Sequence, residues 1–265
     1  MGLTRKSKEF GKDGSFVDNA TKRQLKKQDQ FVSTTEHLVA WVQQNRTKAL
    51  IAAVTVVVVI LAIIGGYTLY QHRSAAAETA LGAAMQTYQT PLADAGQPLE
   101  PGTKTFPSAK DRAAAANAQF TQVAQQYGLT KSGKLAEYLT GLTYMEEGQY
   151  GPAEDALKKT AGSWDGGLAA LGKMALAGLY QQTGRDQQAV DIYSELSKST
   201  QATVPAGLAQ IQLAELYQSE GKTEEARKIY AQLKDNDKDS KGKPGAAAQV
   251  ATEKLNPDAA AGPAQ

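Results

Sequence analysis

One uncharged, strongly apolar run dominates the hydrophobic pattern of this chain. It extends from Ala49 to Tyr70 and contains 22 residues, with Lys48 directly before it. A helix of that length spans roughly 33 Å, which is enough to cross a hydrocarbon core of about 30 Å. Its middle is rich in β-branched residues, which are poor helix formers in water, but in lipid a helix satisfies the backbone hydrogen bonds. The run therefore predicts a transmembrane helix over residues 49–70.

The run has two alternative explanations. A secretory signal peptide begins near residue 1 and ends in a small-residue cleavage site, whereas this run begins late and is too long. A buried helix of a soluble protein rarely contains so many uncharged residues in succession. Trp41 lies before the run, and Tyr67 and Tyr70 lie at its end, as is typical of the two water interfaces of a span.

Two small residues inside the run, Ala62 and Gly66, have the four-residue spacing that lets membrane helices approach closely. The pair predicts a packing face for a partner helix, and the alternative is contact with lipid alone.

Two segments precede the span. Residues 1–19 are polar and basic, so they are expected to form a disordered cytoplasmic head. Residues 20–48 carry apolar side chains at helical spacing and predict an amphipathic juxtamembrane helix. Such a helix can lie on anionic lipid, dock on a partner, or only lead the chain into the membrane.

The pattern beyond the span is helical. The helix is expected to continue to Pro91, and the segment 91–108, which contains four prolines, is typical of a long loop. Another helix is predicted over 109–127. Near the C-terminus the stretch "KPGAAAQVATEKL" predicts a closing helix, and residues 256–265 are expected to form a disordered tail.

Three segments after residue 130 repeat one pattern at intervals of 36 and 37 residues. In each, glycine follows a tyrosine by four residues, alanine follows the glycine by five, and leucine or tyrosine follows the alanine by four. The glycine is expected to end a first helix in a left-handed conformation, and the alanine to lie where a second helix crosses it closely. The repeated positions are Tyr144, Tyr180 and Tyr217; Gly148, Gly184 and Gly221; Ala153, Ala189 and Ala226; and Leu157, Tyr193 and Tyr230.

One helical hairpin cannot bury its apolar stripe alone, so the repeated hairpins are expected to stack into a solenoid. Helix 109–127 carries Ala116 and Phe120 at the second-helix positions, which predicts a further, atypical hairpin that pairs 73–90 with 109–127. The predicted fold is all-α: a single transmembrane helix, then about three to four helical hairpins and a capping helix, with the repeat domain over residues 71–255.

Charge predicts the orientation of the span. Residues 1–48 contain ten Lys/Arg and five Asp/Glu, whereas residues 71–265 contain 19 and 22. Because basic residues stay in the cytoplasm, the N-terminus is expected there. In a bacterium the chain would then be a single-pass inner-membrane protein in contact with lipid, with its repeat domain in the periplasm.

The sequence contains little that could support catalysis. It has no cysteine, which excludes disulfides, thiol nucleophiles and a lipoprotein anchor. The histidines, His37 and His72, lie on opposite sides of the predicted span and cannot share a metal site. Adjacent carboxylates such as Glu224 and Glu225 face different sides of a helix. We therefore expect no enzymatic activity, cofactor, metal or nucleic-acid partner.

The repeat resembles the tetratricopeptide repeat, including a glycine or alanine three residues before the tyrosine. The period is 36–37 residues rather than about 34. A second departure concerns the early tryptophan position of the consensus, which holds Glu137, Lys173 and Gln210.

This resemblance implies a concave groove that is lined by the first helix of each hairpin and binds other proteins. The groove would be apolar and rich in amides, without the lysines and arginines that capture a peptide C-terminal carboxylate. Such a surface suits helices or extended hydrophobic segments. The alternatives are that these side chains pack between repeats, or that the N-terminal helix covers them. The implied groove residues are Leu135, Tyr138, Leu142 and Met145; Leu171, Met174, Gln181 and Gln182; and Leu208, Ile211, Glu215 and Gln218.

The whole architecture resembles the YfgM-type ancillary subunit of the bacterial Sec translocon. The resemblance covers roughly residues 20–255 and includes "STTEHLVAWVQQNRTKAL", a helix with an interfacial tryptophan before the span. It implies association with the translocon channel, a membrane-anchored parvulin-like periplasmic foldase and emerging secreted polypeptides. The proline-rich insertion departs from the family. The alternative is another envelope-assembly or division scaffold of the same architecture that is not linked to the translocon.

Overall fold

The computed structural model describes residues 41, 43–93, 102, 104–238 and 242–256. The chain divides into two parts, Met1–Thr68 and Leu69–Gln265, and each is considered by itself. The described residues form helices and contain no strand, only two isolated bridges, so the all-α prediction is confirmed. The predicted head, most of the juxtamembrane helix, half of the proline-rich loop and nearly all of the tail lie outside the described residues.

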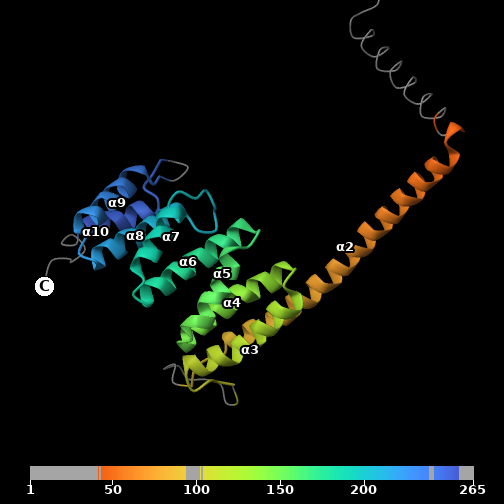
Figure 1. Cartoon of the computed structure of the whole chain (residues 1–265). Coiled ribbons are helices and arrows are strands. Elements are labelled where there is room, and N and C mark those ends of the chain that lie inside the picture. The colour runs from red at the N-terminus through yellow and green to blue at the C-terminus, as the bar shows by residue number, and fades with distance from the viewer. Residues whose placement is uncertain (1–40, 42, 94–101, 103, 239–241, 257–265) are drawn as a thin grey trace, which may run out of the picture. The chain divides into compact units, whose positions relative to one another are not determined.

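The apolar run belongs to α2, a single helix over Arg46–Tyr88 (Figure 1). Every residue from Leu50 to Tyr70 is exposed, and no residue of this segment is buried inside the described part of the protein. The helix is long and apolar enough to cross a membrane. A core helix of a soluble protein would bury a large share of such a surface.

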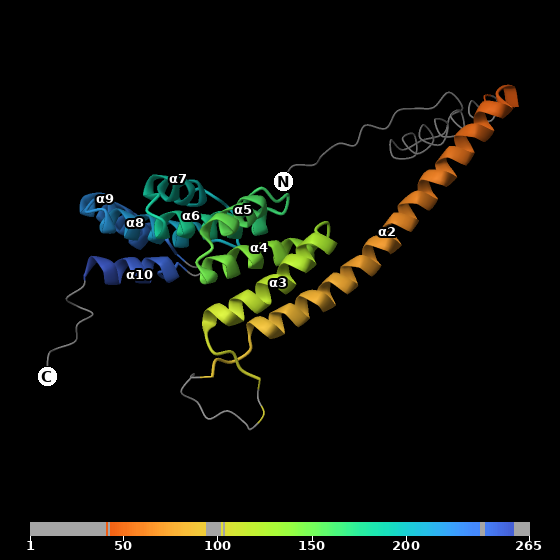
Figure 2. The same ribbon diagram turned by 60° about the horizontal axis from the view of Figure 1, so that its bottom comes forward.

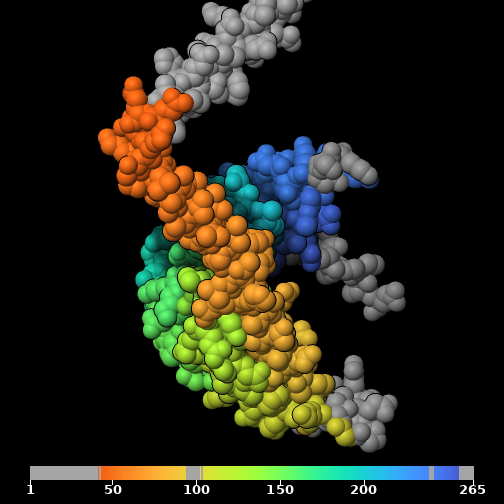
Figure 3. All heavy atoms as spheres, turned by 90° about the vertical axis from the view of Figure 1, so that its right-hand side faces the viewer, coloured from red at the N-terminus to blue at the C-terminus, as the bar shows by residue number. Residues whose placement is uncertain are grey.

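The C-terminal end of α2 forms the first helical hairpin with α3 (Ala109–Tyr127). Phe120 of α3 is fully buried against Leu81 and Ala84 of α2, and the Tyr88 ring meets it edge to face at 6.1 Å. Figure 3 shows the yellow-green helix α3 directly against the yellow end of α2. The predicted pairing across the proline-rich loop is therefore present.

Three further hairpins and a closing helix follow, each helix packing mainly on its neighbours in sequence (Figures 1 and 2). The turn inside each of these three hairpins has two or three residues, whereas loops of four and nine residues join the three hairpins to one another. The helices are α4 (Lys131–Glu147) and α5 (Tyr150–Ala161), α6 (Gly166–Gln182) and α7 (Asp186–Leu196), α8 (Ala206–Ser219) and α9 (Thr223–Asn236), and α10 (Ala246–Leu255).

The repeated glycines end the first helices in the predicted left-handed conformation. Their φ angles are 78° at Gly148, 70° at Gly184 and 78° at Gly221. In each turn the residue after the glycine donates its N–H to the carbonyl of the repeated tyrosine, at 2.8 Å in all three. This is the bond pattern of a Schellman cap, and it explains the fixed spacing of tyrosine and glycine.

We expect Gly184→Val to destabilise the protein by about 1–2 kcal/mol, because a branched side chain at positive φ meets its own backbone. Thermal unfolding of the full-length chain in detergent, followed by circular dichroism, should show a melting temperature roughly 2–8 °C lower. Gly184→Asn is the matched control, since asparagine tolerates this conformation, and it should lose much less. An equal loss in both variants would mean that φ is not the cause.

The repeated alanines are buried on the second helix of each hairpin. Ala153, Ala189 and Ala226 are buried, and so is Ala116 in the first hairpin. The larger side chains four residues later belong to core clusters that include both helices of a hairpin and the element that follows it. These core residues are Phe120, Leu157, Tyr193 and Tyr230, all at most 2% exposed.

The closing helix α10 covers the last hairpin. Ala248 and Ala251 are fully buried, and Ala251 belongs to one core cluster with Tyr230 of α9. The Asp237 carboxylate, at the end of α9, accepts a hydrogen bond from the Ala248 N–H at 2.9 Å. It thereby caps the first turn of α10 across the intervening loop.

Candidate functional site

The surface made by the first helices, α4, α6 and α8, carries the implied groove residues, and they differ in exposure. Leu135 is 37% exposed and Leu208 is 44% exposed, whereas Ile211 is only 8% exposed. Ile211 belongs to the core cluster that includes Ala251 of α10. The other residues are half-buried (Tyr138, Leu142, Met145, Leu171, Met174, Gln181 and Glu215) or exposed (Gln182 and Gln218).

Several of the half-buried residues also contribute to packing between hairpins. Tyr138, Met145 and Met174 pack against the central core cluster of the third hairpin, and burial raises the pKa of the Tyr138 hydroxyl. The membrane residues of the prediction, Ala62 and Gly66, lie on the exposed surface of α2. A Cβ added at Gly66 would contact no other part of the described chain.

A pocket of about 200 Å³ brings two of the implied groove residues together. Leu135 and Leu171 occupy equivalent positions of α4 and α6, and both line this pocket. Trp164, in the loop before α6, also lines it and is 74% exposed. Lys131 and Lys134 line the α4 side of this pocket. Neither lysine is among the implied groove residues, so this end of the implied groove is more cationic than expected.

Trp164 was not among the implied groove residues, because those come from helix positions and it lies in a loop. The signal in the sequence is a tryptophan in the glycine-containing loop "AGSWDGG". The loop is shaped by Asp165, whose Oδ1 accepts from the N–H groups of Gly167 and Leu168 at 3.0 and 3.1 Å. This cap fixes the start of α6 beside the exposed indole.

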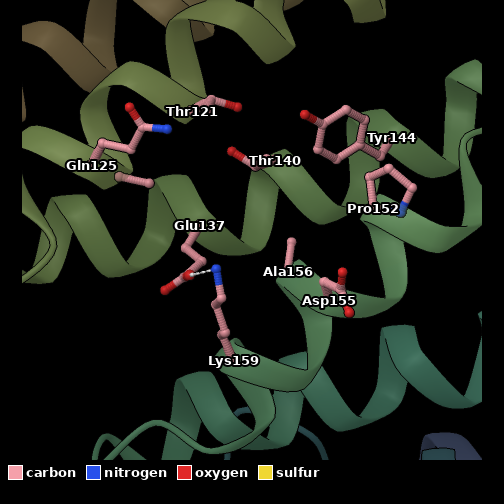
Figure 4. A pocket seen from close by; sticks show the side chains of 10 residues that line it. Thr121, Gln125, Glu137, Thr140, Tyr144, Pro152, Asp155, Ala156 and Lys159 are labelled. Atoms are coloured by element: carbon pink, nitrogen blue, oxygen red, sulfur yellow. Dashed lines mark ion pairs between the residues drawn. The ribbon is translucent and has the colours of Figure 1, made fainter.

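A larger hollow, of about 400 Å³, lies among α3, α4 and α5 (Figure 4). Thr121, Thr140 and Tyr144 line it together with Ala156. At the positions of Thr140 and Ala156 in the second hairpin, the third hairpin has the larger apolar residues Leu176 and Ile192. The smaller side chains of the second hairpin therefore leave the hollow open. The hollow was not predicted, since it results from side-chain size rather than from a motif.

The departure from the tryptophan consensus has a structural explanation. Glu137 pairs with Lys159 at 3.9 Å, linking α4 to α5, and the pair is drawn in Figure 4. Lys173 pairs with Glu195 at 2.5 Å, linking α6 to α7. The second pair stands 36 residues after the first with its charges exchanged. Polar pairs thus join the two helices of a hairpin where the consensus has an aromatic ring.

A second ionic network joins the second hairpin to the third. Glu154 of α5 accepts from Arg185 and Lys158 at 2.7 Å each, and from the Tyr180 hydroxyl at 3.1 Å. The Arg185 guanidinium also stacks on the Tyr180 ring, 4.3 Å from its centroid. These hydrogen bonds, from Lys158 first and then Arg185, lower the pKa of Glu154 to about 2.

The low pKa of Glu154 makes its contribution to stability depend on pH. The contribution is complete above the ordinary value of 4.5 and is lost as the pH falls towards about 2. We expect Glu154→Gln to cost about 1 kcal/mol at neutral pH and low salt, and much less near pH 2, where about half of the Glu154 carboxyl groups are protonated. Urea unfolding of both proteins across this range measures the difference. Asp155→Asn should change stability by less than about 0.5 kcal/mol at neutral pH, and a pH-independent Glu154→Gln effect would contradict the prediction.

Within the described residues, no group of three or more His, Cys, Asp or Glu side chains could hold a metal ion. The repeat domain presents two hollows on its surface: a small, mainly apolar pocket and a larger one with a mixed polar and apolar lining. Such surfaces are typical of proteins that bind other proteins.

The stacked hairpins place the protein in the class of α-solenoids. Its sequence matches the tetratricopeptide repeat-like domain over residues 40–256, and the chain belongs to this family. Comparisons with curated proteins and with solved structures give no match. An all-helical fold of this family is typical of scaffolds that bind other proteins and do not act as enzymes.

Proposed function

We propose that the protein is a membrane-anchored scaffold and an ancillary subunit of the bacterial Sec translocon. One observation carries this proposal: an exposed apolar segment and a tetratricopeptide-like domain with an accessible first-helix face belong to one chain. The exposed segment, residues 50–70, has the length of a membrane span, and none of its residues is buried within the described part of the chain. The domain that follows supplies the binding surface.

The orientation of the proposed span follows from charge. Ten Lys/Arg precede it in residues 1–48, which supports a cytoplasmic N-terminus and a periplasmic domain over residues 71–255. The Ala62 and Gly66 face would then contact a partner helix inside the membrane.

The partners we propose are the translocon channel, a membrane-anchored parvulin-like foldase and polypeptides that emerge into the periplasm. The resemblance in architecture supports all three. The half-buried apolar side chains of the groove, such as Leu142 and Met174, support the last of them, because extended hydrophobic segments bind surfaces of this kind.

The topology is tested with single cysteines, since the chain has none of its own. Ser163→Cys, in the loop before α6, should react with a membrane-impermeant maleimide added to cells whose outer membrane has been made permeable. Ser7→Cys should react only after the inner membrane is opened. The reverse pattern, or equal labelling of both, would contradict the proposed orientation.

The translocon link is tested by photo-crosslinking in native membranes. A photo-reactive amino acid at Leu142 samples the groove, and one at Gly66 samples the span. We expect crosslinks to the channel subunit or the foldase from at least one position. Lys228, exposed on α9, is the matched control position. If crosslinks form to other envelope proteins but to neither of these partners, the scaffold function stands and the translocon link fails.

A further inference from the structure

The pocket between the N-terminal ends of α4 and α6 has the size of one side chain. Its volume is about 200 Å³, below the roughly 300–1,000 Å³ of pockets that hold drug-sized ligands. The apolar lining comes from Leu135 of α4 and from Leu168 and Leu171 of α6. Trp164 lies at its margin and keeps most of its surface exposed.

Trp164 is the feature that points to a ligand. A tryptophan indole that is 74% exposed gains little from folding, whereas a ligand that covers it would remove a large apolar area from water. Tryptophan is also among the residues that dominate binding energy at protein interfaces. Leu129, in the preceding inter-hairpin loop, is 86% exposed but does not line the pocket.

The charges around the pocket favour an acidic ligand. Lys131 makes no ion pair within the part of the chain that the structure describes, and Lys134 makes one with Glu137 at 3.7 Å. The one carboxylate in the lining, that of Asp165, accepts two N–H groups at the start of α6. The positive end of the α6 dipole offsets its charge, so Lys131 is left as the uncompensated group.

We infer that this pocket is a recognition subsite for an extended polypeptide segment: it holds one large apolar side chain under Trp164, with an acidic residue of the same segment beside Lys131. The inference rests on the proposed function as a protein-binding scaffold, but not on the translocon link. It adds a sequence preference to that function, an apolar residue next to an acidic one.

The full chain in phosphatidylcholine nanodiscs provides the test, because it contains only two tryptophans. Trp41→Phe leaves Trp164 as the sole reporter of fluorescence. The probes are three Gly/Ser peptides: one with a leucine followed by two glutamates, one with lysines in place of the glutamates, and one with serine in place of the leucine. We expect the first peptide to shift the Trp164 emission to the blue and to bind on the order of tenfold more tightly than the other two.

Two substitutions separate the apolar and the ionic contributions. Leu135→Ser should lower the affinity for the leucine–glutamate peptide by about tenfold. Leu208→Ser is the matched control, since Leu208 has the equivalent position in α8, is exposed and does not line the pocket. The Leu208→Ser variant should bind the peptide as tightly as the protein without this substitution. Lys131→Glu should abolish the preference for glutamate over lysine, and Lys228→Glu, on the exposed face of α9, should preserve it.

Three results would overturn the inference. One is equal binding of all three peptides, and another is an equal effect of Leu135→Ser and Leu208→Ser. The third is a Trp164 shift in phosphatidylglycerol nanodiscs without peptide, which would make the pocket a lipid contact. If no peptide binds but the groove still crosslinks to other proteins, the inference about the pocket is wrong and the proposed scaffold function stands. If both are absent, the proposed function fails as well.

Discussion

Phe120→Ala is expected to destabilise the repeat domain by about 3–5 kcal/mol, because it removes a fully buried ring and leaves a cavity. The ring holds three helices together: it packs on Leu81 and Ala84 of α2 and shares a core cluster with Ala136 of α4. The melting temperature of the full-length chain in detergent should fall by roughly 6–20 °C. Circular dichroism at the helical minimum measures this directly.

The loss should be largest in the first hairpin. In a solenoid each hairpin contacts only its neighbours, so a defect at one end spreads little. Hydrogen exchange should therefore quicken in α3 and in the end of α2 more than in α8 and α9. Leu129→Ala, at a position that is 86% exposed, should change the melting temperature very little. An equal increase in hydrogen-exchange rates along the whole domain would show that the first hairpin does not unfold separately from the others.

Two glycines of α6 are expected to respond in opposite ways to the same substitution. A Cβ at Gly172 would lie 2.7 Å from the backbone N of Ala161 and 2.9 Å from the backbone C of Thr160. Gly172→Ala should therefore cost about 1–3 kcal/mol through overpacking against the end of α5. A Cβ at Gly178 would meet nothing within 4 Å, so Gly178→Ala should stabilise the helix by roughly 0.5–1 kcal/mol.

Urea unfolding of the two variants in detergent measures both free energies, and each variant is the control for the other. A destabilising Gly178→Ala would mean that this face of α6 is covered. A neutral Gly172→Ala would mean that α5 and α6 can separate at little cost, and that the close approach is not needed for stacking.

The repeat could be predicted from the sequence because its strongest constraints are local. A glycine at positive φ, such as Gly184, has few substitutes, and a buried alanine at a helix crossing cannot be larger. These positions recur at a fixed spacing, and the spacing also identified Phe120 in a hairpin interrupted by a long loop. The predicted helix bounds 109–127 also agree with the structure.

The surface was less predictable because it depends on pairs of side chains from different helices. Whether a hollow opens beside Tyr144 is decided by the combined size of Thr140 and Ala156, and neither belongs to the repeat pattern. Trp164 lies in a loop whose course depends on the Asp165 cap, so helix offsets could not place it beside Leu135. Ile211 lies at a position that the family resemblance assigns to the groove, but it is buried with α10, a helix outside the repeat.

The exchanged ion pairs have a consequence for how the chain folds. Similar hairpins in tandem invite mispairing, in which the second helix of one hairpin docks on the first helix of another. If α7 docked on α4, Glu195 would face Glu137, and if α5 docked on α6, Lys159 would face Lys173. Both mistakes bring like charges together, while both native pairings join opposite ones. The exchanged charges therefore favour the native pairing of each hairpin over these two mistakes.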